Sequence, residues 1–406
     1  MPQVNLTLDR EEVVALFLKE RNEAFAYLME KILNAFLLAE SEEQIGAARH
    51  ERAAERKDYR NGTRERALVT RIGTLILRVP RHRDVPFVTT IFDNYQRSEA
   101  ALLSTMMEMV IQGVSTRKVT DVVETLCGAS FSKSTVSELC KRLDESINQF
   151  KNRALTAHYP FIITDAKYFK VRENHRIVSK AFMVAMGITE DGQKEIIGFD
   201  VYETEAEGTW KQFLTSLKGR GLKEVSMITS DAHSGLIAAM KAVFPETPWQ
   251  RCQYHFQKNI LEQAPKRERA GLQSELREMF NAETMVKARQ RRDEIISDYK
   301  GVAPKAMEVL DEGFEEAMTV MLLPERMRIA LRTSNHLERE NGELARRYNV
   351  IRIFPNVESL TRLMGAVLLE RHDVMSSRRP FFSKQRYTDA IQAIKPELLK
   401  IAQEQV

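Results

Sequence analysis

The chain has 406 residues, of which 43% are apolar and 29% charged, a composition that indicates a folded protein and argues against a disordered one. Its length exceeds what one hydrophobic core usually organises, so we expect two to four domains. No run approaches about 18 apolar residues, and the first residues lack the pattern of a secretory signal, so the sequence predicts neither a membrane span nor export. The three cysteines, Cys127, Cys140 and Cys252, are few and odd in number, which favours a reducing, cytoplasmic location.

The net charge of +4 conceals a basic cluster, because residues 49–84 hold eleven Lys/Arg against five Asp/Glu. The basic residues of this cluster are Arg49, Arg52, Arg56, Lys57, Arg60, Arg64, Arg66, Arg71, Arg78, Arg81 and Arg83. Such local excess favours a polyanionic partner. The alternative is a solvated helix face with local salt bridges.

The N-terminal part is expected to be helical and then to turn into a small β-structure. Apolar residues recur at helical spacing over residues 9–60. Residues 59–63 have the composition of a turn, and residues 66–80 predict two short strands joined around Gly73 and closed by Pro80.

Three helices are predicted next, over residues 99–112, 115–128 and 132–144. The third begins with small polar residues and Lys133 after a short linker, which is typical of a helix-turn-helix DNA-binding unit. A purely structural helical hairpin has the same pattern, and the two interpretations stay open.

From residue 160 the periodicity becomes that of β-structure. The expected order is three strands, a helix, a strand, a helix and a strand, over residues 161–171, 177–189, 195–203, 209–220, 224–230, 234–244 and 249–255. Asp191 and Gly192 form the predicted turn between the second and third strands. This order is that of a ribonuclease-H-like core. Residues 256–330 are predicted to be almost wholly helical and are highly charged, which indicates an inserted helical domain.

The fold class expected is therefore multidomain α+β, with a ribonuclease-H-like α/β catalytic core interrupted by an all-α insertion. The expected segments are an N-terminal helical region (1–58), a basic β-hairpin (59–95), a helix-turn-helix-like DNA-binding domain (96–155), the core (156–255 and 331–375), the insertion (256–330) and a helical tail (376–406). The tail begins with a patch of basic and aromatic residues at 378–387.

Three acidic residues stand where local rules disfavour them. Asp165 interrupts an apolar strand, Asp231 ends another, and Glu338 lies on a helix between two asparagines. A carboxylate in a buried strand is costly unless a partner such as a divalent metal compensates it. Taken singly, the three could be a strand-end turn residue, an N-cap and a surface residue. Together, in this order of elements, they predict one metal site.

Helical spacing selects Glu338 among its neighbours. Asn335, Glu338 and Asn341 are three residues apart and share a face, whereas Glu340 and Glu343 are displaced from it. Strand alternation likewise places Lys167 on the face of Asp165. Few, hard oxygen ligands suit Mg²⁺ or Mn²⁺, and two ions about 4 Å apart can activate a water or a DNA 3′-OH and stabilise the leaving oxygen.

The sequence resembles the Mutator-like bacterial insertion-sequence transposases with a DDE catalytic triad, over nearly its whole length. The resemblance rests on blocks at 60–62, 79–83, 113–117, 132–137, 164–166, 210, 217–222, 230–236, 251–255, 332–341 and 354–356. The frame Asn335-x-x-Glu338-x-x-Asn341 is the most specific of these and matches the family's catalytic glutamate to Glu338. The family pattern matches its two aspartates to Asp165 and Asp231. Glu340 stands where the pattern often has an apolar residue.

The resemblance implies a DNA transposase that binds the terminal inverted repeats of its insertion sequence. It implies 3′-end nicking and strand transfer dependent on Mg²⁺ or Mn²⁺ with two ions per active site, and a copy-out, paste-in route. The partners implied are double-stranded transposon ends, target DNA and a second copy of the chain in a synaptic homodimer, with no membrane and no small-molecule substrate. A nucleoid-associated cytoplasmic location follows.

Other residues are candidates for supporting roles. Cys252 and His255 match a pair in the family pattern, but a zinc site needs about four ligands, so a histidine hydrogen bond that steadies the active site is favoured. Asn335, Asn341 and His233 are further candidates for active-site support, although His233 could equally be a surface residue at a helix start. The candidate DNA-binding residues are Arg60, Arg64, Arg66, Arg81, Arg83, Arg117, Lys118, Lys133, Lys167, Trp210, Arg346, Arg347, Arg378 and Arg379. For Trp210, packing in the core is the favoured alternative.

Two other functions remain possible on sequence grounds. One is a catalytically silent DNA-binding protein derived from a transposase, against which the intact triad argues. The other is a structure-specific nuclease on the same core, which needs neither a helical insertion nor a large basic N-terminal region.

Overall fold

The computed structural model describes residues 10–18, 21–48, 51, 56–70, 73–89, 100–127 and 131–405. The chain divides into two compact units, Met1–Arg142 and Leu143–Val406. Within the described residues, no helix combines the length and the apolar character that crossing a membrane requires.

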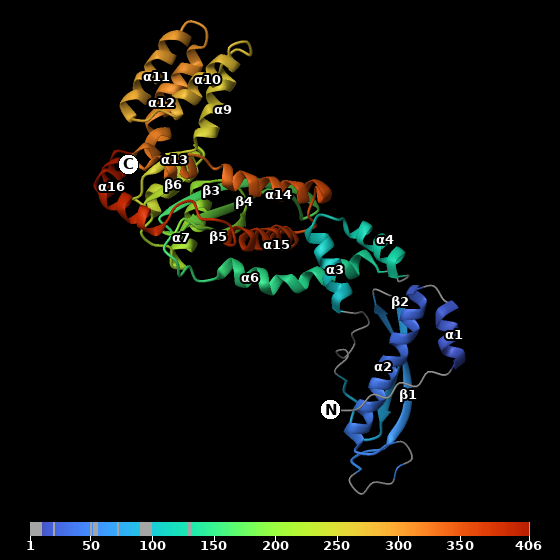
Figure 1. The fold of residues 1–406 in the computed structure, drawn as a ribbon. Helices are drawn as coiled ribbons and strands as arrows, with labels where there is room; N and C mark the ends of the chain where they lie inside the picture. Colours follow the sequence, from blue (N-terminus) through green and yellow to red (C-terminus); the bar gives the residue numbers. More distant parts are fainter. Residues whose placement is uncertain are drawn as a thin grey trace. The chain divides into compact units, whose positions relative to one another are not determined.

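The first unit contains a β-hairpin flanked by helices (Figure 1). Its elements are α1 (Arg10–Leu18), α2 (Arg21–Ile45), β1 (Arg60–Thr70), β2 (Gly73–His82), α3 (Ala100–Ile111), α4 (Thr116–Cys127) and α5 (Lys133–Cys140), followed by a short 3₁₀ turn, η1 (Lys141–Leu143), at the boundary.

The hairpin is longer than the sequence predicts. The strands pair antiparallel from Thr70 opposite Gly73 outward, and the pairing continues past Pro80, a position that a two-stranded sheet tolerates because its strands have free edges. The predicted turn at residues 59–63 is wrong. Gly62 has a φ of +74°, and the register shifts between Arg60 and Thr63, so the glycine produces a bulge within β1. The alternating apolar residues of the hairpin pack on α2 around Leu37.

The three helices α3, α4 and α5 share a core of their own, as the periodicity predicts. Leu102, Met106, Val119, Val123 and Val136 are buried together. The Ser132 side chain accepts a hydrogen bond from the backbone N–H of Thr135, which caps the start of α5. The expected helix pair is therefore present.

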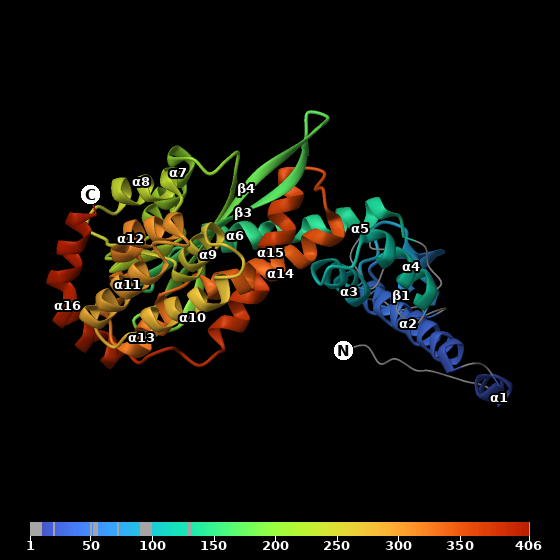
Figure 2. The same cartoon turned by 90° about the horizontal axis from the view of Figure 1, so that it is seen from above.

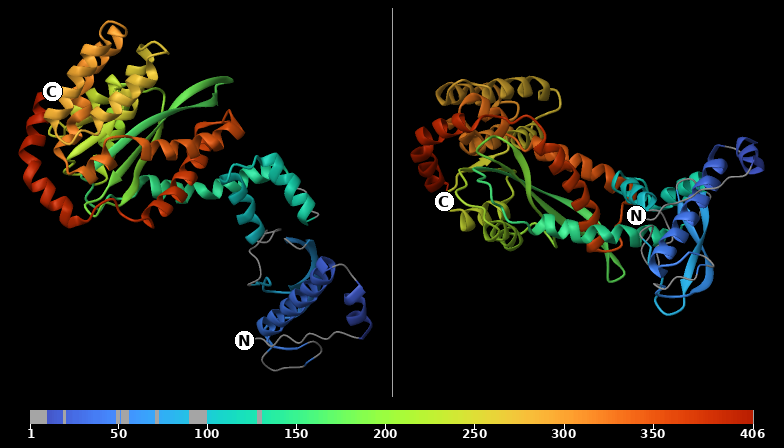
Figure 3. Two further views of the ribbon diagram at one scale, coloured as in Figure 1. Left: turned by 45° about the horizontal axis from the view of Figure 1, so that its top comes forward. Right: turned by 60° about the horizontal axis from the view of Figure 1, so that its bottom comes forward.

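The second unit is built on a five-stranded mixed sheet. Its elements up to the sheet's last strand are α6 (Asp144–Asn152), β3 (Phe161–Glu173), β4 (Arg176–Ile188), β5 (Lys194–Tyr202), α7 (Glu207–Gly219), β6 (Met227–Ser230), α8 (Ser234–Val243) and β7 (Trp249–Arg251). The strand order is β5-β4-β3-β6-β7, with β3, β4 and β5 antiparallel and with β6 and β7 parallel to β3. β3 and β4 run on beyond the shorter strands as a protruding hairpin (Figure 3).

Helices cover both faces of this sheet (Figure 2). On one face, Ile162 and Met183 join Trp210 of α7 and Leu236 of α8 in one apolar core. On the other face, α6 and α15 (Val357–Ser376) pack on Phe199, and α14 (Asn335–Ile351) packs on β3. Asp165 points to this second face, because alternation along β3 places it with Phe169, whose ring meets that of Tyr348 on α14.

The insertion is a helical bundle that follows β7 (Figure 1). It comprises α9 (Gln253–Gln263), α10 (Arg269–Phe280), α11 (Met285–Tyr299), α12 (Pro304–Met318), the 3₁₀ turn η2 (Thr319–Leu322) and α13 (Glu325–Leu331). Residues such as Phe256, Leu276, Ile295 and Phe314 form its own buried core. The predicted strand over 249–255 is too long: β7 ends at Arg251, because β6 offers no partner beyond Ser230.

Three helices complete the unit: α14 (Asn335–Ile351), α15 (Val357–Ser376) and α16 (Lys384–Glu404). The aromatic residues of the patch at 378–387 are only partly on the surface. Phe382 and Tyr387 are buried and place their rings 6.1 Å from that of Phe161, measured between centroids. Arg378 and Arg379 are exposed.

Candidate active site

Asp165 and Asp231 occupy corresponding positions on neighbouring parallel strands. The parallel register pairs Ile163 of β3 with Thr229 of β6. Asp165 lies two residues beyond the first and Asp231 two residues beyond the second, directly after β6 ends. Because parallel strands rise equally per residue, the two carboxylates lie at the same level of the sheet, at the carboxyl end of β6. This end of the sheet is the edge meant for the site.

The electrostatics agree with this proximity. Burial raises the pKa of Asp165 to about 7, and the negative charge of Asp231 raises it further, while His255 acts in the opposite direction. A carboxylate close to a second carboxylate is destabilised by the like charge, so it favours binding a proton or a cation.

Helix α14 is joined to β3 at this point. The side-chain amide of Asn341 donates a hydrogen bond of 2.7 Å to Asp165 Oδ2. Lys167 Nζ donates to the backbone carbonyl of Asn341 at 3.0 Å. The same asparagine therefore orients the aspartate with its side chain and is itself held by its backbone.

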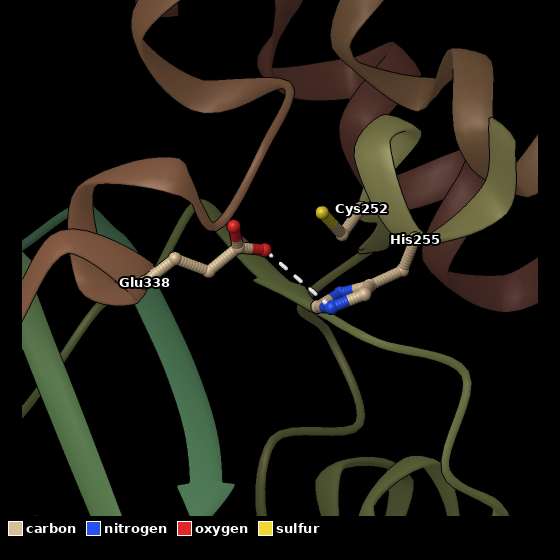
Figure 4. A group of neighbouring side chains, drawn as sticks. All are labelled: Cys252, His255 and Glu338. Atoms are coloured by element: carbon tan, nitrogen blue, oxygen red, sulfur yellow. Dashed lines mark ion pairs between the residues drawn. The ribbon is translucent and has the colours of Figure 1, made fainter. Parts of the chain in front are cut away.

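One helical turn before Asn341, Glu338 meets the start of α9. Its Oε1 lies 3.4 Å from His255 Nε2 and accepts a hydrogen bond of 3.3 Å from the Ser334 hydroxyl. Figure 4 shows Glu338 extending toward the histidine ring, with Cys252 on the same segment as His255. His255 and Glu338 thus link the insertion's first helix to α14.

Cys252 and Ser334 hold this junction together. The buried Cys252 sulfur lies 3.2 Å from Ser334 Oγ and accepts the Ser334 N–H at 3.3 Å. Burial raises the pKa of the Cys252 thiol, but hydrogen bonds to His255 and Ser334 outweigh it, so the pKa lies below its usual value. The hydrogen bond with Cys252 and the charges of Glu338 and Asp165 raise the pKa of His255 to about 9 against the effect of burial. The raised pKa favours the charged form of His255 at neutral pH, beside Glu338.

One group of three metal-ligand side chains is compact in the described part of the chain: Cys252, His255 and Glu338, with ligand atoms within 4.8 Å of one another. Asp165, Asp231 and Glu338 do not form so compact a group. The structure thus brings Asp165 and Asp231 to one edge and Glu338 to the adjacent junction, where His255 acts on both Glu338 and Asp165.

Comparison with known proteins places this arrangement in context. A family model described as "Transposase, Mutator family" matches residues 1–377. The transposase for insertion sequence element IS256 in transposon Tn4001 of Staphylococcus aureus is 41% identical over 385 residues, covering 93% of this chain and 98% of the relative.

The chain belongs to the Mutator family of transposases. The transposase for insertion sequence element ISRM5 of Rhizobium meliloti is 42% identical over 342 residues, covering 84% of this chain and 86% of the relative. The transposase for IS1081 of Mycobacterium tuberculosis is 33% identical over 390 residues, covering 95% and 94%. Membership in this transposase family confirms the predicted resemblance.

The other glutamates near Glu338 on α14 pair with arginines, in agreement with their predicted displacement from the face of Glu338. Glu340 is buried and receives two hydrogen bonds from the guanidinium of Arg371. Glu343 pairs with Arg346 and Arg347. Among the carboxylates of α14 named from the sequence, Glu338 alone faces the junction with His255.

Two residues of the second unit that were candidates for DNA contact are buried. Trp210 is completely buried between α7 and the sheet, with its ring beside that of Phe213, so it packs in the core. Arg347 is also buried and forms an ion pair with Glu343, because its place on α14 faces the sheet layer. Neither side chain offers a surface to DNA.

The other candidates of the second unit lie near the surface. Lys167 is half-buried and bonded to Asn341, which makes it part of the Asp165 environment. His233 stands at the N-cap of α8 with Nε2 4.0 Å from Glu205 Oε2. Arg346 is exposed and hydrogen-bonds Glu343. Asn335 is exposed at the first residue of α14.

In the first unit, the candidate DNA-binding residues differ in their surroundings. Arg60 donates hydrogen bonds to the backbone carbonyls of Ala47 and Ala48, so it helps to join β1 to the end of α2. Arg66 is partly exposed. The remaining candidates are exposed: Arg64, Arg81, Arg83, Arg117, Lys118 and Lys133.

Sequence reasoning missed Ser334 and Glu205 as participants. Ser334 stands at the N-cap of α14, yet it makes no cap hydrogen bond through its side chain and instead bridges Cys252 and Glu338. Burial raises the pKa of Glu205, and Asp231 raises it further. Neither role is marked locally, because Cys252 lies 82 residues from Ser334, and α7 and β6 separate Asp231 from Glu205.

Proposed function

We propose that this Mutator-family transposase binds the terminal inverted repeats of its insertion sequence and catalyses metal-dependent 3′-end nicking and strand transfer. Asp165, Asp231 and Glu338 are the proposed catalytic carboxylates. The observation that carries the proposal is the junction of α14 with the sheet edge. There, Asn341 binds Asp165 and the same helix, one turn earlier, directs Glu338 toward His255.

The residues present fit a hard divalent cation. Asp165 and Asp231 gather negative charge at one edge, and burial makes that charge costly without a compensating cation. The side-chain oxygen of Asn341 is buried and has no hydrogen-bond partner among the described residues, which leaves an acceptor free beside Asp165. Carboxylate and amide oxygens are the donors that Mg²⁺ and Mn²⁺ prefer.

In this proposal Asp165, Asp231 and Glu338 would hold Mg²⁺ or Mn²⁺, with two ions per active site. Such ions supply activation of a water or 3′-OH nucleophile and stabilisation of the leaving oxygen. Asn341 and Lys167 orient Asp165, and His255 positions Glu338 through its charge. The Cys252–Ser334 contacts keep His255 and Glu338 on facing elements.

The fold supports the proposal at a coarser level. The parallel pairing of β3 with β6 and of β6 with β7 supports the proposed ribonuclease-H-like core, and α9 to α13 follow the last strand where the insertion is expected. The exposed arginines of β1 and β2 and the α4–α5 pair are the proposed DNA-binding surfaces. The synaptic homodimer and the copy-out, paste-in route rest on the family resemblance.

The test is a strand-transfer assay with the full chain, a labelled duplex carrying its own element's end, and target DNA, under titration with Mg²⁺ or Mn²⁺. We expect metal-dependent nicking at the 3′ end followed by joined product, and no product with Asp231→Ala, which should still bind the end. Products of hydrolysis alone would favour a nuclease. End binding by the wild-type protein without any reaction would favour a catalytically silent DNA-binding protein.

A further inference from the structure

A polar cleft of about 480 Å³ opens between the insertion and the start of α14. Its lining includes Tyr254 of α9, Ser274 and Arg277 of α10, Asn281, Arg332 and Asn335. This set is called the polar cleft below. None of the described residues that line it is acidic.

The two arginines of the polar cleft lie close enough to repel each other. Burial lowers the pKa of Arg332, and the positive charge of Arg277 lowers it further. Arg332 donates a hydrogen bond of 2.7 Å to the Asn281 side chain, which ties it to the end of α10. Arg277 is exposed, and its guanidinium makes no hydrogen bond or ion pair with the described residues. Two neighbouring guanidinium groups repel each other when no carboxylate lies between them. A phosphate would relieve this repulsion, because guanidinium groups bind phosphate with two parallel hydrogen bonds.

The polar cleft adjoins the proposed active site. Tyr254 precedes His255, and their ring centroids are 5.4 Å apart. Asn335 lies one helical turn before Glu338, which is about 4.5 Å along the helix axis. Since a DNA strand advances about 3.4 Å per nucleotide, the polar cleft begins within a few nucleotides of a bond held at the carboxylates.

Two further features suit a nucleic acid strand. The Tyr254 side chain is 46% exposed at the rim, so its ring is accessible to a base. Aromatic rings next to basic side chains are the platforms on which bases stack in single-strand binding sites. The start of α14 adds a positive helix end, because its N-cap Ser334 makes no side-chain cap bond.

We infer that the polar cleft holds the backbone of a DNA strand beside the reacting bond, with Arg277 and Arg332 binding a phosphate and Tyr254 stacking on a base. This inference rests on the proposed function, because the DNA strand in the polar cleft is the substrate of the proposed reaction. It adds a positioning role for the insertion: Arg277 of α10, Arg332 at the end of α13 and Tyr254 of α9 would hold the strand next to His255, which also lies on α9.

The first experiment measures binding of the full chain to a duplex carrying its element's end and flanking DNA, without divalent metal so that nothing is cleaved. Arg277→Ala should weaken binding about tenfold, the loss of one charge-assisted hydrogen-bonded contact, and lower the salt dependence of log Kd by about one phosphate contact. The matched control is Arg326→Ala, which removes an exposed arginine of α13 that does not line the polar cleft.

The second experiment locates the contact. Single phosphates near the reacting bond are replaced by neutral methylphosphonates. One replacement should weaken binding to the wild-type protein but cause no further loss with Arg277→Ala, because both changes remove the same contact. Tyr254→Leu should lower nicking while Tyr254→Phe retains it, because the ring and not the hydroxyl is required.

The outcomes separate this inference from the proposed function. If Arg277→Ala and Arg326→Ala bind alike and no phosphate replacement couples to Arg277, the polar cleft does not hold the strand, even while the wild-type protein nicks and joins DNA. Equal losses in both variants would mean that net charge alone acts, which also overturns the inference. Failure of the wild-type protein to react with metal and end DNA would instead overturn the proposed function.

Discussion

The β1–β2 hairpin of the first unit and the α14 junction of the second use charged residues in opposite ways. On the hairpin, Arg64, Arg81 and Arg83 are exposed to solvent. At the junction, Asp165 and Glu338 each have partners from a distant element. Exposed basic residues add long-range attraction to a polyanion and need little geometry, whereas metal-binding carboxylates need fixed positions. The comparison predicts that hairpin changes alter affinity and junction changes alter chemistry.

The largest expected effect is at Asp165. Asp165→Asn keeps the side-chain shape and can still accept from Asn341, but it removes the charge that would bind a metal. We expect nicking to fall by at least about 10³-fold, since a metal ligand is worth several kcal/mol in the transition state. Single-turnover nicking rates at saturating protein measure this, with end affinity measured in parallel. A rate near that of the wild-type protein would remove Asp165 from the active site.

A second prediction contrasts two carboxylates of one helix. Arg371→Met leaves the buried Glu340 without its partner, and breaking a buried ion pair is strongly destabilising. We expect a loss of about 3 kcal/mol in the free energy of unfolding of the second unit, measured by chemical denaturation. Arg378→Met, at an exposed arginine, should change it little. Equal stabilities of the two variants would mean that Glu340 does not depend on Arg371.

The third prediction concerns a residue that orients a proposed ligand. Asn341→Ala removes the hydrogen bond to Asp165 and should reduce nicking about 10- to 100-fold, as loss of a partner that orients a metal ligand does. Asn349→Ala is the matched control, because Asn349 is exposed on the same helix. Excess metal should partly restore the rate of Asn341→Ala but not of Asp165→Asn. The idea fails if both asparagine variants nick DNA at the wild-type rate.

The smallest effect is expected on the hairpin. Arg81→Ala combined with Arg83→Ala should weaken end binding about tenfold at moderate salt and lower the salt slope by about 1.8, with the nicking rate of bound DNA unchanged. The control removes two exposed lysines of the insertion, Lys300 and Lys305. A hairpin variant that binds normally but nicks slowly would reverse the assignment of the two regions.

Much of the second unit was predictable because its local patterns are strong. Alternation identified β3, β4 and β5, and helical spacing separated Glu338 from Glu340, which the structure buries against Arg371. The surroundings of His255 were harder to predict, because the sequence predicts a strand through residue 255, whereas strand pairing stops at Arg251 and α9 begins at Gln253.

What the sequence could not supply is the set of long-range contacts. Asn341 and Asp165 are 176 residues apart, and Cys252 and Ser334 are 82 apart, so only the fold brings them together. Charge alone also does not reveal that Arg347 is buried, because a basic residue on a helix can be buried if a neighbouring glutamate pairs with it. For Trp210, the complete burial agrees with the core packing that the sequence favoured.

The central claim is that Asp165, Asp231 and Glu338 bind metal together. Anomalous scattering from Mn²⁺ in crystals of the full chain with its DNA ends tests it most directly. The account predicts manganese within about 2.2 Å of carboxylate oxygens of Asp165 and Asp231, with Glu338 completing the site. Manganese held instead by Cys252, His255 and Glu338, with none at Asp165, would contradict it.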